Sequence, residues 1–161
     1  MSAPWLQAVM LGQADLSDYS KDLPRDSLTG VRGTLAGAQV SADFQARMRA
    51  MDPALTDFSY AAEAYDAVVV AALAARAAQG DLGQSVAGRL AEVSGGGQRC
   101  TTFRECAKLL EAGVEIDYDG LSGRIEFDSN GDVGEGTFGV YTYGRDNTYT
   151  RTATRVVRPG G

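Results

Sequence analysis

The sequence predicts an α/β fold in which a short sheet is flanked by helices and followed by a β-rich C-terminal tail. Apolar residues recur at helical spacing in the middle of the chain, from residue 41 to about residue 112, whereas the residues after Ile116 alternate with a period of two. The chain has 161 residues, 44% of them apolar, which suffices for one domain with a substantial core. We therefore expect residues 1–161 to form a single domain.

The N-terminal part is expected to contribute two strands. Trp5–Leu11 is an apolar run with the length of a short buried strand, and residues 12–15 follow it as a loop. Val31–Gly37 alternates and carries glycines toward both ends, as a second strand would. Open α/β sheets bind ligands at the carboxyl ends of their strands, so the loop that contains Asp15 is a candidate ligand contact.

Two helices are expected next. Ser41–Met51 has apolar residues at helical spacing and stops before Pro53, because a residue that precedes proline disfavours the helical conformation. Phe58–Ala78 gives the strongest prediction, with Asp57 or Ser59 available as N-cap and abundant alanine. The face expected to be deeply packed consists of Tyr65, Val68, Val69, Ala72 and Leu73.

Two shorter helices follow. Gln84–Val93 presents three apolar residues at helical spacing before the glycine-rich loop Ser94–Gly97. Thr102 begins a capping-box pattern with Glu105, which predicts a helix that runs to about Ala112 and ends on a glycine. Cys106 is then expected in the first turns of this helix, and Cys100 in the loop before it.

The C-terminal third reads as strands and turns. Gly123–Phe127, Thr137–Tyr143 and Tyr149–Val157 are expected strands, and Gly144–Asn147 is a hairpin-type turn between the last two. Asp128–Asp132 begins like a calcium loop, but it lacks the glycine and the glutamate that such a loop needs at positions six and twelve. We interpret it as a tight turn whose Asn-Gly pair adopts positive φ.

Charge and hydropathy exclude two classes of partner. The chain has 21 acidic and 15 basic residues and a net charge of −6, and its basic residues are scattered instead of forming the basic face of a nucleic-acid-binding domain. No stretch reaches the roughly 18 uncharged apolar residues of a membrane span. The N-terminus has neither the basic segment nor the apolar core of a signal peptide, so we expect none in this chain.

The sequence lacks the residues that usually perform catalysis. The chain has no histidine, neither lysine lies in a recognisable motif, and the glycines at 95–97 lack the residues of a phosphate-binding loop. Glu63 with Asp66, or Asp117 with Asp119, could formally divide acid and base roles, but such close pairs are more often solvated or capping groups. We expect a binding protein without catalytic residues, metal or cofactor.

Cys100 and Cys106 leave several interpretations open. They are either a disulfide, two independent thiols or half of a metal site, and the last is a poor fit without histidine. A disulfide here would close a ring of seven residues and contribute about 2.4 kcal/mol by the chain-entropy estimate. Tyr60 is equally open, because it is either a wall of a ligand site at a helix N-terminus or an ordinary aromatic residue.

Three motifs, in order, resemble the C-terminal half of the branched-chain amino-acid type of periplasmic binding protein, which serves ABC importers. They are Tyr60–Val68, the Cys100–Cys106 spacing before a Leu-Leu-Glu-x-Gly helix end, and Tyr118–Phe127. The likeness extends from about residue 6 to about residue 150. It implies the C-terminal lobe of a type 1 periplasmic-binding-protein-like fold, in which two lobes close over a small polar ligand.

The resemblance also implies roles for individual residues. Tyr60 matches the aromatic residue that lines the ligand cleft, and Asp15 falls near the acidic residue that pairs with a ligand ammonium. Tyr65 and Asp66 match a recurrent Tyr-Asp-Ala that we assign to support and packing. The family likeness, together with the spacing, favours a Cys100–Cys106 disulfide, which implies an oxidising compartment.

These implications give two hypotheses about function. In the first, the chain is part of a lipoprotein-like, extracytoplasmic solute-binding protein that captures an amino acid or amide and delivers it to an ABC permease. The N-terminal lobe of such a protein has no counterpart in this sequence. In the alternative, the chain is a stand-alone sensory or protein-interaction domain derived from the same fold.

Overall fold

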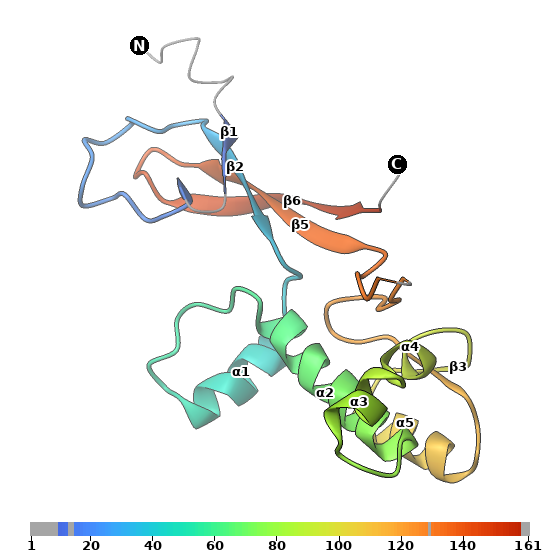
Figure 1. Ribbon diagram of the computed structural model, residues 1–161. Helices are drawn as coiled ribbons and strands as arrows, with labels where there is room; N and C mark the ends of the chain where they lie inside the picture. The colour runs from blue at the N-terminus through green and yellow to red at the C-terminus, as the bar shows by residue number, and fades with distance from the viewer. Residues whose placement is uncertain (1–9, 13–14, 129, 159–161) are drawn as a thin grey trace. The chain divides into compact units, whose positions relative to one another are not determined.

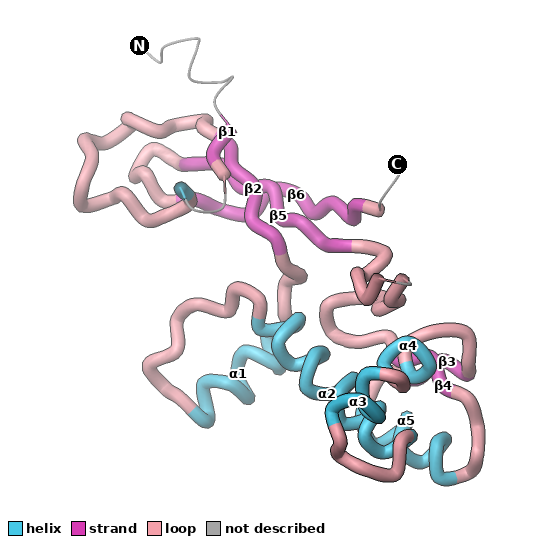
Figure 2. The backbone as a smooth tube through the Cα atoms, viewed as in Figure 1, coloured by secondary structure: helices cyan, strands magenta, loops and turns pink. Residues whose placement is uncertain are grey.

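The computed structural model describes residues 10–12, 15–128 and 130–158, and its fold is mixed α/β, as predicted (Figure 1). The chain forms two compact units, which are described separately below. Unit 1 comprises Met1–Ala36 and Thr137–Val157, and unit 2 comprises Gly37–Gly136 and Arg158–Gly161. Strands make up the regular structure of unit 1, whereas unit 2 contains the helices (Figure 2). The expectation of a single domain stays a prediction.

Unit 1 is built on a four-stranded sheet of order β1-β2-β5-β6. The strands are β1 (Met10–Leu11), β2 (Arg32–Ala36), β5 (Gly136–Tyr143) and β6 (Tyr149–Val157). β1 is parallel to β2, and β2 is antiparallel to β5. The last three strands and the hairpin turn were predicted. Of the first predicted strand, Met10 and Leu11 form β1, and the remainder lies outside the described residues.

Asn147, in the hairpin turn, organises the loop that joins β1 to β2. Its side chain is fully buried, and its amide oxygen accepts a hydrogen bond from Leu28 N at 3.0 Å. Its amide nitrogen donates to Leu23 O at 3.1 Å and to Pro24 O at 2.8 Å. Nearby, Leu16, Val31 and Tyr143 form the buried core of this unit. The hairpin and the loop are therefore held together by a satisfied buried amide.

Unit 2 contains the helices α1 (Ala42–Met51), α2 (Ala61–Ala77), α3 (Gly83–Ala87), α4 (Leu90–Val93) and α5 (Phe103–Glu111). α1 and α5 follow the prediction closely: Ser41 Oγ accepts from Phe44 N, and Thr102 Oγ1 accepts from Glu105 N. The predicted helix Gln84–Val93 is instead two short helices, α3 and α4. Gly88 separates them, because glycine is among the poorest residues for continuing a helix.

The buried face of α2 differs from the predicted one. Ala61, Ala62, Asp66, Val69, Val70, Leu73 and Ala74 are buried, whereas Val68 is 69% exposed and Ala72 is also exposed. Val69 and Leu73 were placed correctly, and Tyr65 is half-buried and packs against the core. The prediction failed for Val68 and Ala72 because alanine and valine occur around the whole circumference of the helix, so that periodicity alone could not select a face.

A second, two-stranded sheet was not fully predicted. β3 (Gln98–Cys100) pairs in parallel with β4 (Ile116–Tyr118), so Cys100 lies in a strand and not in a loop. A Cys100–Cys106 disulfide, with 5.4 Å between the Cα atoms, joins β3 to α5 and confirms the expected pairing. The position just before β3 requires glycine, Gly97, because a Cβ there would overlap with the Glu115 backbone.

The predicted strand Gly123–Phe127 is wrong. This segment makes only isolated bridges, from Arg124 to Asp119 and from Phe127 to Val133. The expected turn after it is confirmed, with the predicted positive φ shown for Gly131, at 86°; the Asp128 carboxylate accepts hydrogen bonds from the N–H groups of Asn130 and Asp132. None of the helices in the described part of the chain is long and apolar enough to cross a membrane.

Candidate functional site

The N-terminus of α2 has an unusual start. Tyr60 is the N-cap residue and has φ of 60° and ψ of 10°, the left-handed conformation that residues other than glycine rarely adopt. Its side chain makes no capping hydrogen bond and is 38% exposed. Ala61 N, the first N–H of the helix, donates instead to Phe58 O at 3.1 Å, and the N–H groups of the first turn lie at the positive end of the helix dipole.

Asp57 and Ser59, which were predicted as alternative N-caps of α2, form a turn before the helix instead. The Asp57 carboxylate accepts a hydrogen bond from Ser59 N at 2.9 Å, and hydrogen bonds from the Ser59 side chain and backbone hold the pKa of Asp57 below its usual value. Phe58 packs against the core formed by α1 and the start of α2, with the Arg49 guanidinium 4.6 Å from its ring centre. The turn before α2 is thus fixed on both sides, which allows Tyr60 to hold a strained backbone conformation.

Glu63 ties this helix start to the segment that follows β2. Glu63 Oε1 accepts a hydrogen bond from Ala38 N at 2.7 Å, and Gly37 approaches both Tyr60 N and the Glu63 carboxylate. Gly37 has φ of 115°, a conformation open to glycine. Glu63 Oε2 is buried and has no hydrogen-bond partner among the described residues. The sequence suggested Glu63 only as an acid beside Asp66, and its contact with Ala38 was not predictable because the partner is a backbone group.

Asp66 lies one turn further along α2 and is 1% exposed. Its carboxylate accepts four hydrogen bonds: from the Tyr118 hydroxyl at 2.8 Å, from Leu121 N at 3.0 Å, and from the N and Oγ of Ser122 at 2.6 Å each. We call this group the Asp66 clamp. Gly120 completes it, because a Cβ at that position would overlap with the carboxylate.

Tyr118 and Tyr65 complete the surroundings of the clamp. Burial, followed by the hydrogen bond to Asp66, raises the pKa of the Tyr118 hydroxyl well above its usual value. The ring of Tyr65 packs edge-on against Phe44, with 5.4 Å between ring centres. These contacts lie in the interior of unit 2. The assignment of Tyr65 and Asp66 as supports of a ligand site stays a prediction.

Asp15, the second predicted ligand contact, belongs to unit 1 and is exposed. Its backbone carbonyl accepts a hydrogen bond from the Tyr19 hydroxyl at 3.2 Å. Tyr60 belongs to unit 2, so the structure describes the two residues within separate units. The assignment of each of them as a ligand contact stays a prediction.

The four acids considered for catalysis make different contacts. The Asp66 carboxylate accepts four hydrogen bonds, whereas one oxygen each of Glu63, Asp117 and Asp119 is buried without a hydrogen-bond partner among the described residues. Desolvation, followed by the charge of Asp119, raises the pKa of Asp117, and Arg99 forms an ion pair with Asp119. Within the described residues, no group of acidic or cysteine side chains is arranged to hold a metal ion.

Comparison with known proteins identifies the family. Residues 13–146 match the family model described as the receptor family ligand binding region, and this span includes Asp15, Tyr60, the Asp66 clamp and both cysteines. No curated protein and no solved structure matches the chain. Since the match covers most of the 161 residues, the chain belongs to the family of receptor ligand-binding regions, whose domains are of the periplasmic binding protein type 1 kind.

Proposed function

We propose that this chain is the C-terminal portion of an extracytoplasmic solute-binding protein that captures an amino acid or amide for an ABC importer. The observation that carries the proposal is the match of residues 13–146 to a ligand-binding family. The finer assignment to the branched-chain amino-acid type is supported by the three motifs described above. Such a protein makes and breaks no covalent bond and uses no cofactor.

The chemistry at the start of α2 suits a zwitterionic or amide ligand. The partly exposed Tyr60 ring offers an apolar wall, and the positive end of the helix dipole favours a carboxylate or carbonyl oxygen. Asp15 is proposed separately, within unit 1, as a carboxylate that pairs with a ligand ammonium. The strained conformation of Tyr60 supports a functional role, because such strain is typical of ligand-binding sites.

Capture in this proposal needs a second lobe. An N-terminal lobe outside these 161 residues would supply the remaining ligand contacts, and closure of the two lobes would follow from contacts to both. An ABC permease would then receive the ligand. The disulfide supports an extracytoplasmic location, because disulfides persist in oxidising compartments.

A thermal-shift screen tests the proposal. The chain, expressed together with the N-terminal lobe, is heated in the presence of single amino acids, their amides and unrelated sugars. A ligand at a hundred times its Kd should stabilise the protein by about 2.7 kcal/mol. Tyr60→Phe should keep most of this shift and Tyr60→Ala should lose it.

Two outcomes contradict the proposal. If no amino acid or amide raises the melting temperature, the proposed ligand class is wrong. If a ligand stabilises wild type and Tyr60→Ala equally, the site is elsewhere. A stable complex with a protein, without any small ligand, would instead favour a sensory or interaction domain.

A further inference from the structure

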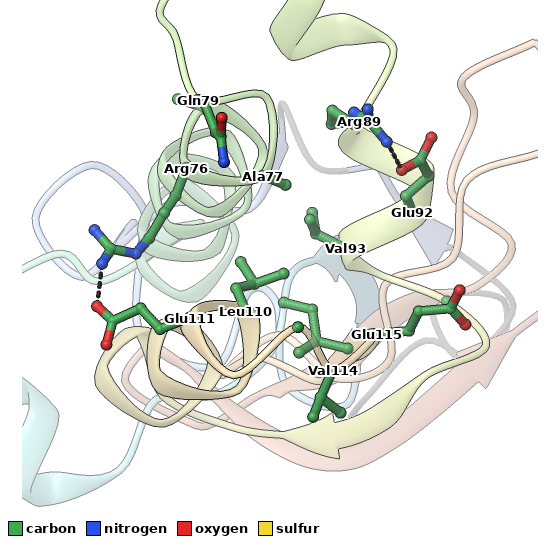
Figure 3. Close-up of a pocket in the computed structure, with 14 residues that line it drawn as sticks. Arg76, Ala77, Gln79, Arg89, Glu92, Val93, Leu110, Glu111, Val114 and Glu115 are labelled. Carbon is green, nitrogen blue, oxygen red and sulfur yellow. Dashed lines mark hydrogen bonds and ion pairs between the residues drawn. The ribbon is translucent and has the colours of Figure 1, made fainter.

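Unit 2 contains a pocket that is separate from the proposed solute site. It has a volume of about 880 Å³ and lies between the C-terminal ends of α2 and α5, helix α4 and the segment that leads into β4 (Figure 3). Ligand sites in proteins typically have volumes of about 300–1,000 Å³. The pocket begins at Ala75, roughly 22 Å along the α2 axis from Tyr60. Neither Tyr60 nor Asp15 lines it.

The floor of the pocket is apolar and its rim is charged. Val93 is fully buried, and the half-buried Leu110 and Val114 also line the pocket. Two ion pairs occupy the rim, one between Arg76 and Glu111 and the other between Arg89 and Glu92. Figure 3 shows these two pairs on different sides of the apolar floor. A ligand here would find an apolar surface framed by charges.

The one carboxylate in the lining without a counterion, among the described residues, is that of Glu115. Its side chain forms no hydrogen bond or ion pair there, whereas its backbone carbonyl accepts from Gln98 N at 2.8 Å. Because both arginines of the lining are already paired, the pocket carries one uncompensated negative charge. An anion would have to displace an existing ion pair, whereas a cation would not.

Two helix ends strengthen this preference. α2 ends beside the pocket with Gln79 at φ of 52°, and α5 ends there with Gly113 at φ of 74°. In each case the backbone turns back on the helix, with Gly80 N donating to Ala75 O and Val114 N donating to Leu109 O. The C-terminal end of a helix carries partial negative charge and favours a cation.

We infer that this pocket binds a small organic cation with an apolar body, such as an arylalkylamine. The ammonium group pairs with Glu115, and the apolar body contacts the apolar part of the lining, which includes Val93 and Leu110. A metal ion is a poorer fit, because the described residues contain no group of metal-ligating side chains and the floor is apolar.

The test is a titration of the ¹⁵N-labelled 161-residue chain with phenethylamine, followed by amide NMR shifts. We expect saturable shifts at Gly95, Gly113 and Glu115. Phenylacetate, which has the same ring and a negative charge, should bind at least fivefold more weakly. Glu115→Gln should weaken phenethylamine binding by about two- to fivefold, the range typical of an exposed ion pair.

Asp132→Asn is the matched control. It removes one negative charge from a turn that does not line the pocket. It should therefore weaken phenethylamine binding less than Glu115→Gln does. The inference is overturned if phenethylamine leaves the pocket amides unshifted, if phenylacetate binds equally well, or if the two variants have equal effects. The experiment requires neither an N-terminal lobe nor an amino-acid ligand, so its outcome is independent of the proposed function.

Discussion

Replacement of Asp66 by asparagine should destabilise unit 2 severely while leaving its shape nearly unchanged. The carboxylate is 1% exposed and accepts four hydrogen bonds, two at each oxygen. An asparagine keeps one oxygen and places an NH₂ group at the other. Whichever way the amide turns, at least one backbone N–H, of Leu121 or Ser122, then faces another donor.

The size of the effect follows from the donors that lose their acceptor. A hydrogen bond to a charged group contributes about 1.5–3 kcal/mol, and a buried donor left without an acceptor costs about 1–3 kcal/mol. The variant loses two charge-assisted bonds and recovers part of this loss, because asparagine is cheaper to bury than aspartate. We therefore expect Asp66→Asn to lower the free energy of unfolding by about 3 kcal/mol.

Urea unfolding, followed by circular dichroism at 222 nm, measures the effect. Ser122→Ala is the graded control: it removes one of the four hydrogen bonds and keeps the backbone donor, so it should cost about 1 kcal/mol. The reasoning fails if the free energy of unfolding of Asp66→Asn lies within about 0.5 kcal/mol of the wild-type value, which is the usual range for surface substitutions. It also fails if Ser122→Ala costs as much as Asp66→Asn.

Three further predictions concern stability. Burial raises the pKa of Tyr118 above 10.0. The Tyr118 hydroxyl therefore ionises near pH 10 in the unfolded chain but keeps its proton at that pH in the folded chain. The free energy of unfolding should therefore fall by about 1.4 kcal/mol per pH unit above pH 10, and urea titrations should show a shallower fall for Tyr118→Phe. Gly120→Ala should lower the free energy of unfolding by more than about 2 kcal/mol, because the new Cβ would overlap with the Asp66 carboxylate. Gly83→Ala is the control and should be near neutral, because no atom lies within 4 Å of a Cβ at that position. Equal urea midpoints for the two variants would disprove this. Reduction of the Cys100–Cys106 disulfide should lower the free energy of unfolding by about 2.4 kcal/mol, and an unchanged midpoint in reducing buffer would contradict the estimate.

Helices with local signals were predictable from the sequence. Thr102 and Glu105 form their capping contact within one turn, and Gly113 ends α5 at positive φ, so each boundary was encoded by residues close together in the chain. The C-terminal strands were predictable for the same reason, since a hairpin joins neighbouring segments.

Features that depend on distant partners were not predictable in detail. Asp66 receives its donors from residues more than 50 positions away, and no local pattern marks an acidic residue in an alanine-rich helix as buried. β3 has only three residues and exists through its pairing with β4. Tyr60 was expected to follow an Asp57 or Ser59 cap, yet the backbone of the preceding turn makes Tyr60 itself the cap.

The central claim is that Tyr60 forms part of a site for an amino acid or amide, and calorimetric titration tests it most directly. The protein that contains both lobes is titrated with the ligand that gives the largest thermal shift, as wild type, Tyr60→Phe and Tyr60→Ala. We predict that Tyr60→Ala weakens binding at least tenfold and that Tyr60→Phe stays within about threefold of wild type, because the ring supplies the apolar contact. Equal affinities for wild type and Tyr60→Ala would contradict the claim.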